Sequence, residues 1–266
     1  MIRIRQLTKR YGDNAVLRGV DFDAAPGEFV VVLGESGAGK STLLHCVNRL
    51  AVADGGELNV DGMDAVHCAD TRALRQRVAM IFQHHNVVPR LSALKNVLTG
   101  RLGAVSTLAS VLHFFSREDI ALAHECLARV GLAHKAHERT DSLSGGQMQR
   151  VGIARALAQK PRLILADEPV ASLDPQTSRK VLQYLHDASR ELGITVLCNL
   201  HQVDYAREFA DRIVGLAQGR VVFDGAPQAM GPEDIDRIYT PQPAADRKDA
   251  AGPAARLAPL VAGAHR

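Results

Sequence analysis

The sequence predicts an α/β fold built around a parallel sheet, and three observations support this prediction. Two runs, residues 29–33 and 163–166, are continuously apolar and rich in Val, Leu and Ile, as strands buried on both faces of a parallel sheet are. The first run breaks at Gly34, and a segment that suits a helix begins at Ser41. Residues 1–28 instead alternate short strand-like pieces with turns, which predicts an antiparallel β layer before the central sheet.

The remaining elements follow in order along the chain. Short strands are expected at Ile2-Arg3-Ile4, Val20-Asp21-Phe22 and residues 56–62, with turns at residues 11–14 and 26–27. From Leu91 to about Lys160 the pattern is helical, with apolar steps of three and four residues at Ile120, Leu122, Ala123, Cys126, Leu127 and Val130. Strands are expected again at residues 163–166, 194–200, 212–215 and 221–223. We therefore expect one domain over residues 1–240, with a helical subdomain inserted at about residues 86–160.

The segment from Gly34 to Ser41, GESGAGKS, predicts a phosphate-binding loop. Its glycines allow a tight turn that directs successive N–H groups at one point, which the positive end of the following helix also faces. Lys40 is expected to reach the β- and γ-phosphates, and the Ser41 hydroxyl to ligate Mg²⁺. A glycine-rich turn that only caps a helix requires neither side chain. The nucleotide-binding residues predicted from the loop are Gly34, Glu35, Ser36, Gly37, Ala38, Gly39, Lys40, Ser41 and Thr42.

An acidic pair ends the apolar run at residues 163–166. Asp167 and Glu168 stand at the carboxyl end of this strand, where open α/β sheets place their ligands. Asp167 is expected to hold Mg²⁺ through water, and Glu168 to polarise an attacking water molecule. The alternative is that the pair only caps the next helix, with Pro169 as its first residue.

The segment LSGGQ, Leu143 to Gln147, predicts a further helix N-terminus. Ser144 and Gln147 have the spacing of a capping box, which is a purely structural explanation. Gly145 and Gly146 favour a function, because glycine costs about 1 kcal/mol in a helix relative to alanine. We expect the two glycines to let a phosphate approach the bare N–H groups of the first turn. The helix is expected to bury Val151, Ile153, Ala154 and Leu157, and to leave Arg150 and Arg155 available to solvent or acidic partners.

Composition excludes several classes of protein. Of the 266 residues 46% are hydrophobic, and the net charge of +3 offers no broad basic surface, so no nucleic-acid partner is expected. The four cysteines show no CxxC pair and no secretory leader is expected at Met1, which predicts a reduced, cytoplasmic protein with Cys46 and Cys198 buried. The longest uncharged stretch, residues 102–116, is shorter than the about 20 apolar residues that a bilayer requires. Residues 241–266, rich in Ala, Pro, Gly and charge, are expected to form a disordered tail.

Together these motifs resemble the ATP-binding subunits of ABC transporters, and the resemblance covers almost all of residues 1–240. The family's features occur here in its order: Walker A at residues 34–42, Gln83 after an apolar strand, the LSGGQ signature, Walker B ending in Asp167 and Glu168, the loop Ala171-Ser172-Leu173-Asp174, and His201 after a last core strand. The resemblance implies a P-loop NTPase, RecA-like core sheet with an N-terminal antiparallel β subdomain and an inserted helical subdomain. It also implies ATP hydrolysis, with ATP and Mg²⁺ as cofactors.

The resemblance further implies roles for single residues. Tyr11 would stack on adenine, His201 would contact the γ-phosphate, and Gln83 would contact both Mg²⁺ and a membrane partner. The implied catalytic residues are Glu168, His201, Lys40 and Gln83, with Glu168 as base, and the implied Mg²⁺ ligands are Ser41, Gln83 and Asp167. Taken singly, Tyr11 is also a common turn aromatic, Gln83 a polar strand end and His201 a surface histidine.

The resemblance implies partners as well. Family members form head-to-tail dimers, and this chain has one Walker A and one signature, so a homodimer is predicted. The residues that would complete the phosphate site of the other copy are Ser144, Gly145, Gly146, Gln147 and Asp174. The implied partners are transmembrane permease subunits and, indirectly, a substrate-binding protein. The chain would then lie peripherally on the cytoplasmic face of the inner membrane.

Two parts of the sequence resemble the phosphonate importer subgroup in particular: residues 96–103 with 115–119, and residues 199–204. The first part lies where contact with the membrane partner is expected, although an amphipathic stripe there equally suits packing, at Leu108, Val111, Leu112 and Phe115. The alternatives are an energiser of phosphite, phosphate or amino-acid import, and a soluble ABC ATPase that acts with a carbon–phosphorus lyase complex. The pair His84-His85 departs from the subgroup pattern and lacks a third metal ligand in sequence.

Overall fold

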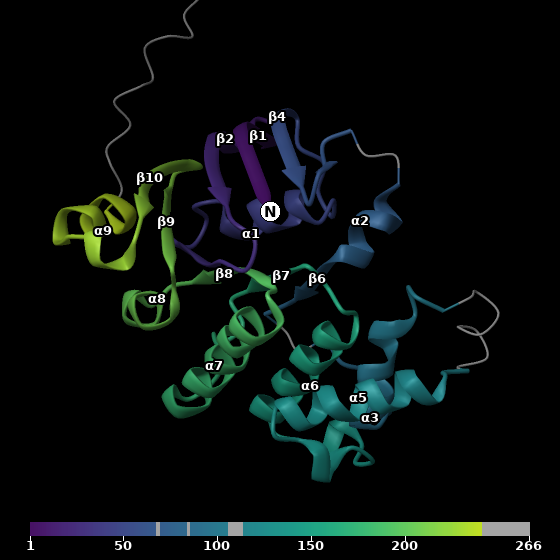
Figure 1. Cartoon of the computed structure of the whole chain (residues 1–266). Coiled ribbons are helices and arrows are strands. Elements are labelled where there is room, and N and C mark those ends of the chain that lie inside the picture. The colour runs from purple at the N-terminus through teal and green to yellow at the C-terminus, as the bar shows by residue number, and fades with distance from the viewer. Residues whose placement is uncertain (68–69, 84–85, 106–113, 241–266) are drawn as a thin grey trace, which may run out of the picture.

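Two sheets and a group of helices make up the chain, as its computed structural model shows (Figure 1). The structure describes residues 1–67, 70–83, 86–105 and 114–240. The predictions for His84-His85, for Leu108, Val111 and Leu112, and for the tail at residues 241–266 lie outside these ranges. Of the helices within them, none combines the length and the hydropathy that crossing a bilayer requires.

The smaller sheet is antiparallel and lies at the N-terminus. Its strands are β1 (Ile2–Tyr11), β2 (Asn14–Ala24), β4 (Gly55–Val60) and β5 (Met63–Asp64), in the order β2-β1-β4-β5. A tight hairpin joins β1 to β2, with Tyr11 paired to Asn14. Alternate residues at the start of β1, Ile2 and Ile4, are buried, so one face of this sheet packs against the rest of the molecule. The predicted antiparallel layer is confirmed.

The larger sheet is the parallel sheet expected from the apolar runs. Its strands are β3 (Phe29–Leu33), β6 (Val78–Ile81), β7 (Leu163–Asp167), β8 (Thr195–Leu200), β9 (Arg212–Ala217) and β10 (Arg220–Gly225), in the order β10-β9-β3-β8-β7-β6. Neighbouring strands are parallel except at one edge, where β10 pairs antiparallel with β9. Every residue of β3, β7 and β8 is buried, as in strands covered on both faces.

Helices cover both faces of the larger sheet, because successive strand residues point to opposite sides. Val30 and Val32 pack with Leu43 of α1 (Lys40–Val47) and with the smaller sheet, whereas Phe29 and Val31 pack into a second cluster on the other side. The helices that contribute to this second cluster include α6 (Gly145–Ala158), α7 (Pro175–Leu192), α8 (Val203–Phe209) and α9 (Pro232–Tyr239), the last preceded by η4 (Pro227–Ala229). The phosphate loop before α1 is thus held between the two sheets.

A group of helices extends from the edge strand β6, which α2 (Thr71–Arg77) precedes. Its members are α3 (Ala93–Leu98), η1 (Thr99–Arg101), α5 (Arg117–Arg129), η2 (Ala133–Lys135), η3 (Thr140–Ser142) and α6. Gly100 lets η1 approach α6, because a Cβ there would clash with the main-chain oxygen of Arg155. Phe115, from the predicted amphipathic stripe, packs against the buried cluster of these helices.

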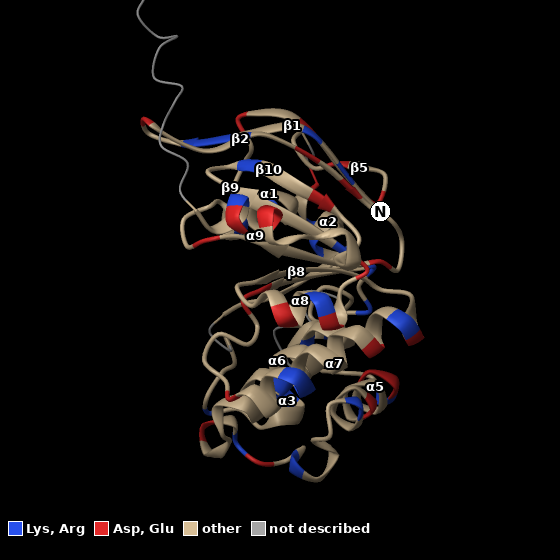
Figure 2. Cartoon of the chain, turned by 90° about the vertical axis from the view of Figure 1, so that its left-hand side faces the viewer, with Lys and Arg blue, Asp and Glu red and all other residues tan. Residues whose placement is uncertain are grey.

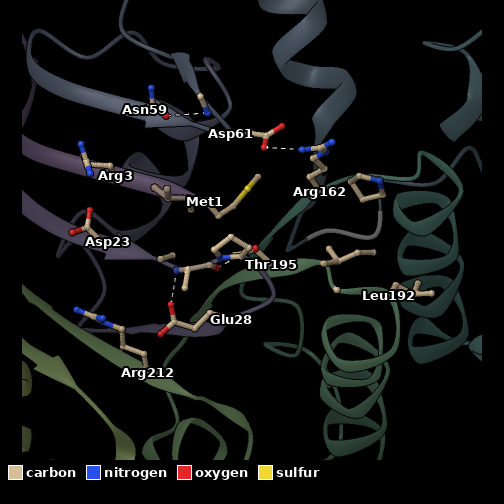
Figure 3. A pocket seen from close by; sticks show the side chains of 18 of the residues that line it. Met1, Arg3, Asp23, Glu28, Asn59, Asp61, Arg162, Leu192, Thr195 and Arg212 are labelled. Atoms are coloured by element: carbon tan, nitrogen blue, oxygen red, sulfur yellow. Dashed lines mark hydrogen bonds and ion pairs between the residues drawn. The ribbon is translucent and has the colours of Figure 1, made fainter.

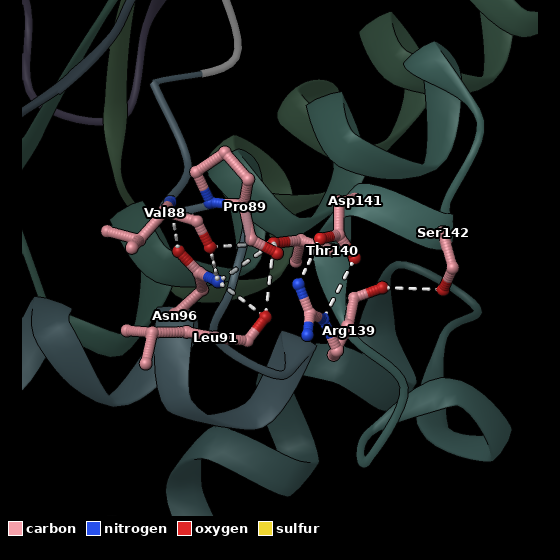
Figure 4. A network of polar contacts seen from close by, with 8 residues as sticks. All are labelled: Val88, Pro89, Leu91, Asn96, Arg139, Thr140, Asp141 and Ser142. Atoms are coloured by element: carbon pink, nitrogen blue, oxygen red, sulfur yellow. Dashed lines mark hydrogen bonds and ion pairs between the residues drawn. The ribbon is translucent and has the colours of Figure 1, made fainter.

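A buried polar network fastens the loop before α3 to these helices (Figure 4). Asn96 and Thr140 are fully buried, and the Asn96 amide donates to the Thr140 hydroxyl at 3.2 Å. The main-chain oxygens of Val88 and Leu91 lie within hydrogen-bond distance of both side chains. Buried polar groups are stable when they are paired in this way, so the network sets the path of the loop that follows Gln83.

Two arginines of α6 are partly exposed, in line with the prediction, and also bind main-chain oxygens of this chain. Arg150 Nη1 donates to the main-chain oxygen of Val130 at 3.1 Å, and Arg155 Nη1 to that of Asn86 at 2.5 Å. Burial lowers the pKa of Arg155. Both side chains therefore connect α6 to other segments of this chain, while part of each remains open to solvent. The apolar residues of α6 are buried as predicted: Val151, Ile153, Ala154 and Leu157.

The cysteines of the described ranges lie in the core. Cys46, Cys126 and Cys198 are buried and form no disulfide. Burial raises the pKa of Cys46 and of Cys126 to about 11. These thiols therefore stay protonated and unreactive near neutral pH, as predicted for Cys46 and Cys198.

Acidic and basic residues are interspersed along the ribbon in Figure 2. Several of them pair, as in Arg5 with Asp23 at 2.6 Å and Arg212 with Asp224 at 2.5 Å. Residues of opposite charge thus lie beside one another at these positions. The absence of a nucleic-acid partner stays a prediction.

Candidate active site

The loop between β3 and α1 has the geometry of an anion site. Gly37 and Gly39 have φ angles of 84° and 105°, which favour glycine. Gly39 is also the N-cap of α1 and has no side chain with which to cap the first N–H groups of that helix. A Cβ on Gly34 would clash with the main-chain oxygen of Leu216 in β9, so the loop lies directly against the sheet. Bare N–H groups and the positive end of α1 favour a bound anion here.

Lys40 is the cation of this loop and is almost completely buried, with 4% of its surface exposed. Its Nζ donates to the main-chain oxygens of Gly34 at 2.8 Å and of Glu35 at 3.0 Å. Burial lowers the pKa of Lys40, while the nearby charges of Glu168 and Asp167 act in the opposite direction. A buried ammonium whose hydrogen-bond partners are carbonyl oxygens suits an anion as its next neighbour.

Side chains from three elements meet beside Lys40. Ser41 Oγ on α1 donates to Asp167 Oδ1 at 2.9 Å, and Asn199 Nδ2 on β8 donates to the same oxygen at 2.8 Å. The parallel register of β7 and β8 brings Asp167 opposite Asn199. A hydroxyl and a carboxylate side by side are the oxygen ligands that Mg²⁺ prefers, so Ser41 and Asp167 fit this ion.

Glu168 and His201 form a second pair at the carboxyl ends of β7 and β8. His201 Nε2 lies 2.6 Å from Glu168 Oε1, and the Glu168 side chain is only 18% exposed. Glu168 has a φ of 48°, an uncommon conformation for a residue other than glycine. Such strain persists where the surrounding structure enforces it, and it concentrates at functional sites. The pair can therefore hold a carboxylate in one orientation beside the phosphate loop.

The LSGGQ segment forms a capped helix start. Ser144 Oγ accepts a hydrogen bond from Gln147 N at 3.3 Å, and Gln147 Oε1 accepts one from Ser144 N at 2.9 Å, so the capping box is present. A Cβ on Gly146 would lie 2.5 Å from Cγ2 of Thr177 in α7. Packing against Thr177 thus explains why a glycine is needed at position 146. The approach of a phosphate, which the sequence pattern suggests, is a second and separate explanation.

Asp174 stands nearby as the N-cap of α7. Its carboxylate accepts hydrogen bonds from Gln176 N at 3.1 Å and Thr177 N at 3.0 Å, and the hydrogen bonds from Thr177 hold its pKa below the usual range. Across the described part of the chain, no hydrogen bond or ion pair joins Asp174, Ser144 or Gln147 to the phosphate loop. Within the described residues of one chain, the signature is therefore not bonded to the phosphate loop.

Tyr11 and Gln83 also lie outside the polar constellation. Tyr11 ends β1 with 52% of its surface exposed, and Lys9 Nζ lies 5.1 Å from its ring centroid. Gln83 is exposed and lies two residues after the end of β6. Their predicted contacts with adenine, Mg²⁺ and a partner stay predictions.

Sequence reasoning assigned no role to Asn199 or Tyr239, although both touch predicted site residues. The Tyr239 hydroxyl on α9 donates to the main-chain oxygen of His201 at 2.8 Å, and burial raises the pKa of Tyr239 to about 12. The sequence does contain a hint for Asn199, because this residue is an amide within the otherwise apolar segment Val196 to Leu200. Tyr239 had none, because its contact depends on how α9 packs against the sheet.

A cavity of about 1070 Å³ lies elsewhere, beside the amino ends of β3, β8 and β9 (Figure 3). Acidic and basic side chains both line it, among them Arg3, Asp23, Glu28, Asp61, Arg162 and Arg212. None of the predicted site residues lines it. This cavity is therefore separate from the candidate active site.

Comparison with known proteins assigns the family. The sequence pattern of the family described as "ABC transporter" matches residues 17–171, which include the phosphate loop, the signature and the acidic pair. The chain belongs to the ABC transporter family. Both the predicted family and the predicted fold class are confirmed.

Individual members of the family can be aligned with this chain over most of their length. The phosphonates import ATP-binding protein PhnC of Thiobacillus denitrificans is 52% identical over 239 residues, 90% of this chain and 92% of that protein. The phosphite import ATP-binding protein PxtA of Stutzerimonas stutzeri is 52% identical over 249 residues, 92% of this chain and 90% of that protein. A solved dimeric ATP-binding cassette in a post-hydrolysis state, bound to ADP and phosphate, is 33% identical with a TM-score of 0.73 and covers 86% of this chain and all (100%) of its own.

The chain is therefore an ATP-binding, ABC-type ATPase subunit. The structure brings together Lys40, Ser41, Asp167, Glu168 and His201. The roles of these residues, and those of the signature, Tyr11, Gln83 and Asp174, stay predictions.

Proposed function

We propose that this chain energises an importer of phosphonates, hydrolysing ATP as one of two identical cytoplasmic subunits on transmembrane permease subunits. The observation that carries ATP hydrolysis is the partly buried constellation of Lys40, Ser41–Asp167 and Glu168–His201 at the carboxyl ends of β3, β7 and β8. The identity to a phosphonate import protein over 90% of the chain supports the cargo.

The geometry supports a division of work among the residues. The N–H groups after Gly39 and the Lys40 ammonium bind and orient the phosphates, because both carry positive charge into a buried site. Ser41, Asp167 and Gln83 would hold Mg²⁺, which when bound neutralises charge that develops on the phosphates. Glu168 orients the attacking water and accepts its proton at the carboxylate, while His201 holds Glu168 in place.

Two copies would complete each site. The residues Ser144, Gly145, Gly146, Gln147 and Asp174 make no bond to the phosphate loop of their own chain within the described residues, which leaves them available to the loop of a second copy. The dimeric structure of a related cassette supports this arrangement. A site that is complete only in the closed dimer gives ATP a preference for that state, and hydrolysis removes the preference.

The remaining partners follow from the transport role. The permease subunits would hold the chain at the cytoplasmic face of the inner membrane. A substrate-binding protein would deliver the phosphonate to the opposite face. Neither contact requires a membrane-spanning helix in this chain.

The change Glu168→Gln tests the ATPase mechanism. Removing the carboxylate while keeping its shape should lower kcat by about 100-fold or more, with ATP affinity retained. Analytical ultracentrifugation of this variant with ATP should show a dimer. The matched control is Glu208→Gln, an exposed glutamate that pairs with Arg179 on the surface. Unchanged hydrolysis in Glu168→Gln would contradict the assignment, and a monomer under saturating ATP would contradict the shared site.

Phosphite is a second candidate cargo, favoured by the 52% identity to a phosphite import protein. Growth on a phosphonate or on phosphite as sole phosphorus source, with and without this chain, separates the two. Loss of growth on the phosphonate alone is the expected result. Loss on phosphite alone would replace phosphonate as the cargo.

A further inference from the structure

Asn199 is a fully buried amide in the middle of the larger sheet. It lies in β8, where every residue is buried, and its own exposed fraction is 0%. The parallel registers place it between Val32 of β3 and Asp167 of β7. An apolar side chain would suit this position in a buried parallel strand better than an amide does.

The amide has one polar partner among the described residues. Asn199 Nδ2 donates to Asp167 Oδ1 at 2.8 Å, and Ser41 Oγ donates to that same oxygen at 2.9 Å. No described residue donates to the other oxygen, Oδ2. Two donors that come from different elements and converge on one oxygen fix the rotation of the Asp167 carboxylate and leave Oδ2 open.

The other end of the amide lacks such a partner. Asn199 Oδ1 is buried and has no hydrogen-bond partner. An unpaired buried oxygen is unfavourable, and a leucine of similar shape would avoid it. Packing therefore does not explain this residue, and its effect has to lie at Asp167.

We propose that Asn199 is a positioning residue, which holds Asp167 so that its free oxygen Oδ2 is presented to Mg²⁺ at the phosphate site. This inference rests on the proposed function and goes beyond it, because Asn199 acts through Asp167 and touches neither nucleotide nor metal. Asn199 should therefore affect the gain in ATP affinity that Mg²⁺ provides, and not the affinity measured without the metal.

The experiment measures ATP affinity with Mg²⁺ and with EDTA, in full-length Glu168→Gln protein so that no turnover interferes. Adding Asn199→Leu should leave the affinity in EDTA within about twofold and reduce the Mg²⁺-dependent gain by about tenfold. The matched control is Leu197→Val, two residues earlier on the same strand and face, where no polar partner is lost. Should Asn199→Leu fail to fold, Asn199→Val supplies the test, because β-branched residues suit strands.

A second pair of variants tests the route of the effect. In a protein that also carries Asp167→Asn, the change Asn199→Leu should have no further effect on the Mg²⁺-dependent gain, because its only route is removed. Equal losses with Mg²⁺ and with EDTA, or an unchanged gain, would overturn the positioning role. These results differ from a failure of the proposed function, which would appear as a Glu168→Gln parent that binds no ATP.

Discussion

Individual residues of the site carry strain and unpaired groups that a packed core normally avoids. Glu168 has a left-handed backbone, Lys40 is a nearly buried ammonium, and Asn199 keeps a buried oxygen without a partner. Each is unfavourable in isolation. They occur together at the carboxyl ends of adjacent strands, where open α/β sheets bind ligands. The cost to stability is therefore concentrated at the candidate active site.

Two explanations for the glycine at position 146, packing against Thr177 and the approach of a phosphate, can be tested separately. The change Gly146→Ala should destabilise the protein by about 1–3 kcal/mol, because the new methyl group would collide with Thr177 Cγ2. Adding Thr177→Ser, which removes that methyl group, should restore the thermal unfolding midpoint, and Thr177→Ser alone serves as the control. If ATPase activity stays low in the restored double variant, Gly146 also serves the phosphate site of the partner copy. A Gly146→Ala protein as stable as the parent would contradict the packing argument.

Among the helices around α6, the side chain of Arg101 connects three elements. Arg101 in η1 donates to Asp119 of α5 at 2.7 Å and to the main-chain oxygen of Ala158 in α6 at 3.2 Å. Asp119 also accepts from the N-cap Ser116 in a capping box. The hydrogen bond from Arg101 is the main cause that holds the pKa of Asp119 below 3.8.

This pair predicts a pH dependence of stability. Because the folded pKa of Asp119 is depressed, its contribution is complete above about pH 4 and is lost as pH falls through the folded pKa. Asp119→Asn should therefore lower the free energy of unfolding by about 1 kcal/mol at pH 7, with a smaller difference at pH 3. Urea unfolding at both pH values measures this. Asp141→Asn is the control, because its partner Arg139 is largely exposed and water screens the pair. An equal difference at both pH values would contradict the argument.

Across the whole molecule, the arrangement of layers separates the two halves of the proposed site. The phosphate loop lies between the two sheets, whereas the signature starts a helix on the opposite side of the larger sheet. The phosphate loop and the signature each precede a helix whose first N–H groups can bind an anion. A single chain with this topology therefore offers two half sites, which suits a head-to-tail pair of copies.

Mixing two inactive variants tests this arrangement. Lys40→Met removes the positively charged side chain that is expected to bind the phosphates, and Ser144→Arg blocks the signature. Each change is made in a Glu168→Gln chain, which is expected to bind ATP without hydrolysing it. In a head-to-tail dimer one pocket of the mixed pair carries both changes and the other is intact, so the mixture should trap one ATP per mixed dimer. Each variant alone should trap none, which is the control, and filter binding gives the stoichiometry. Sites confined to single chains would show no recovery on mixing.

Local patterns were sufficient to predict the strands, the loop and the family. The apolar runs at residues 29–33 and 163–166 and the glycine spacing from Gly34 encode structure within a few residues, because backbone conformation and burial depend on near neighbours. The same patterns did not predict that Arg150 and Arg155 bind carbonyl oxygens of other segments.

The contacts that shape the site required the folded chain. Asp167 meets Asn199 across 32 residues of sequence because β7 and β8 pair in one particular register, and Ser41 reaches Asp167 across 126 residues because α1 packs beside that edge. Strand order and register depend on the burial of the whole core, and no short segment contains that information. The sequence thus specified the chemical groups of this ATPase, and the packing of the sheet specified which of them act on one another.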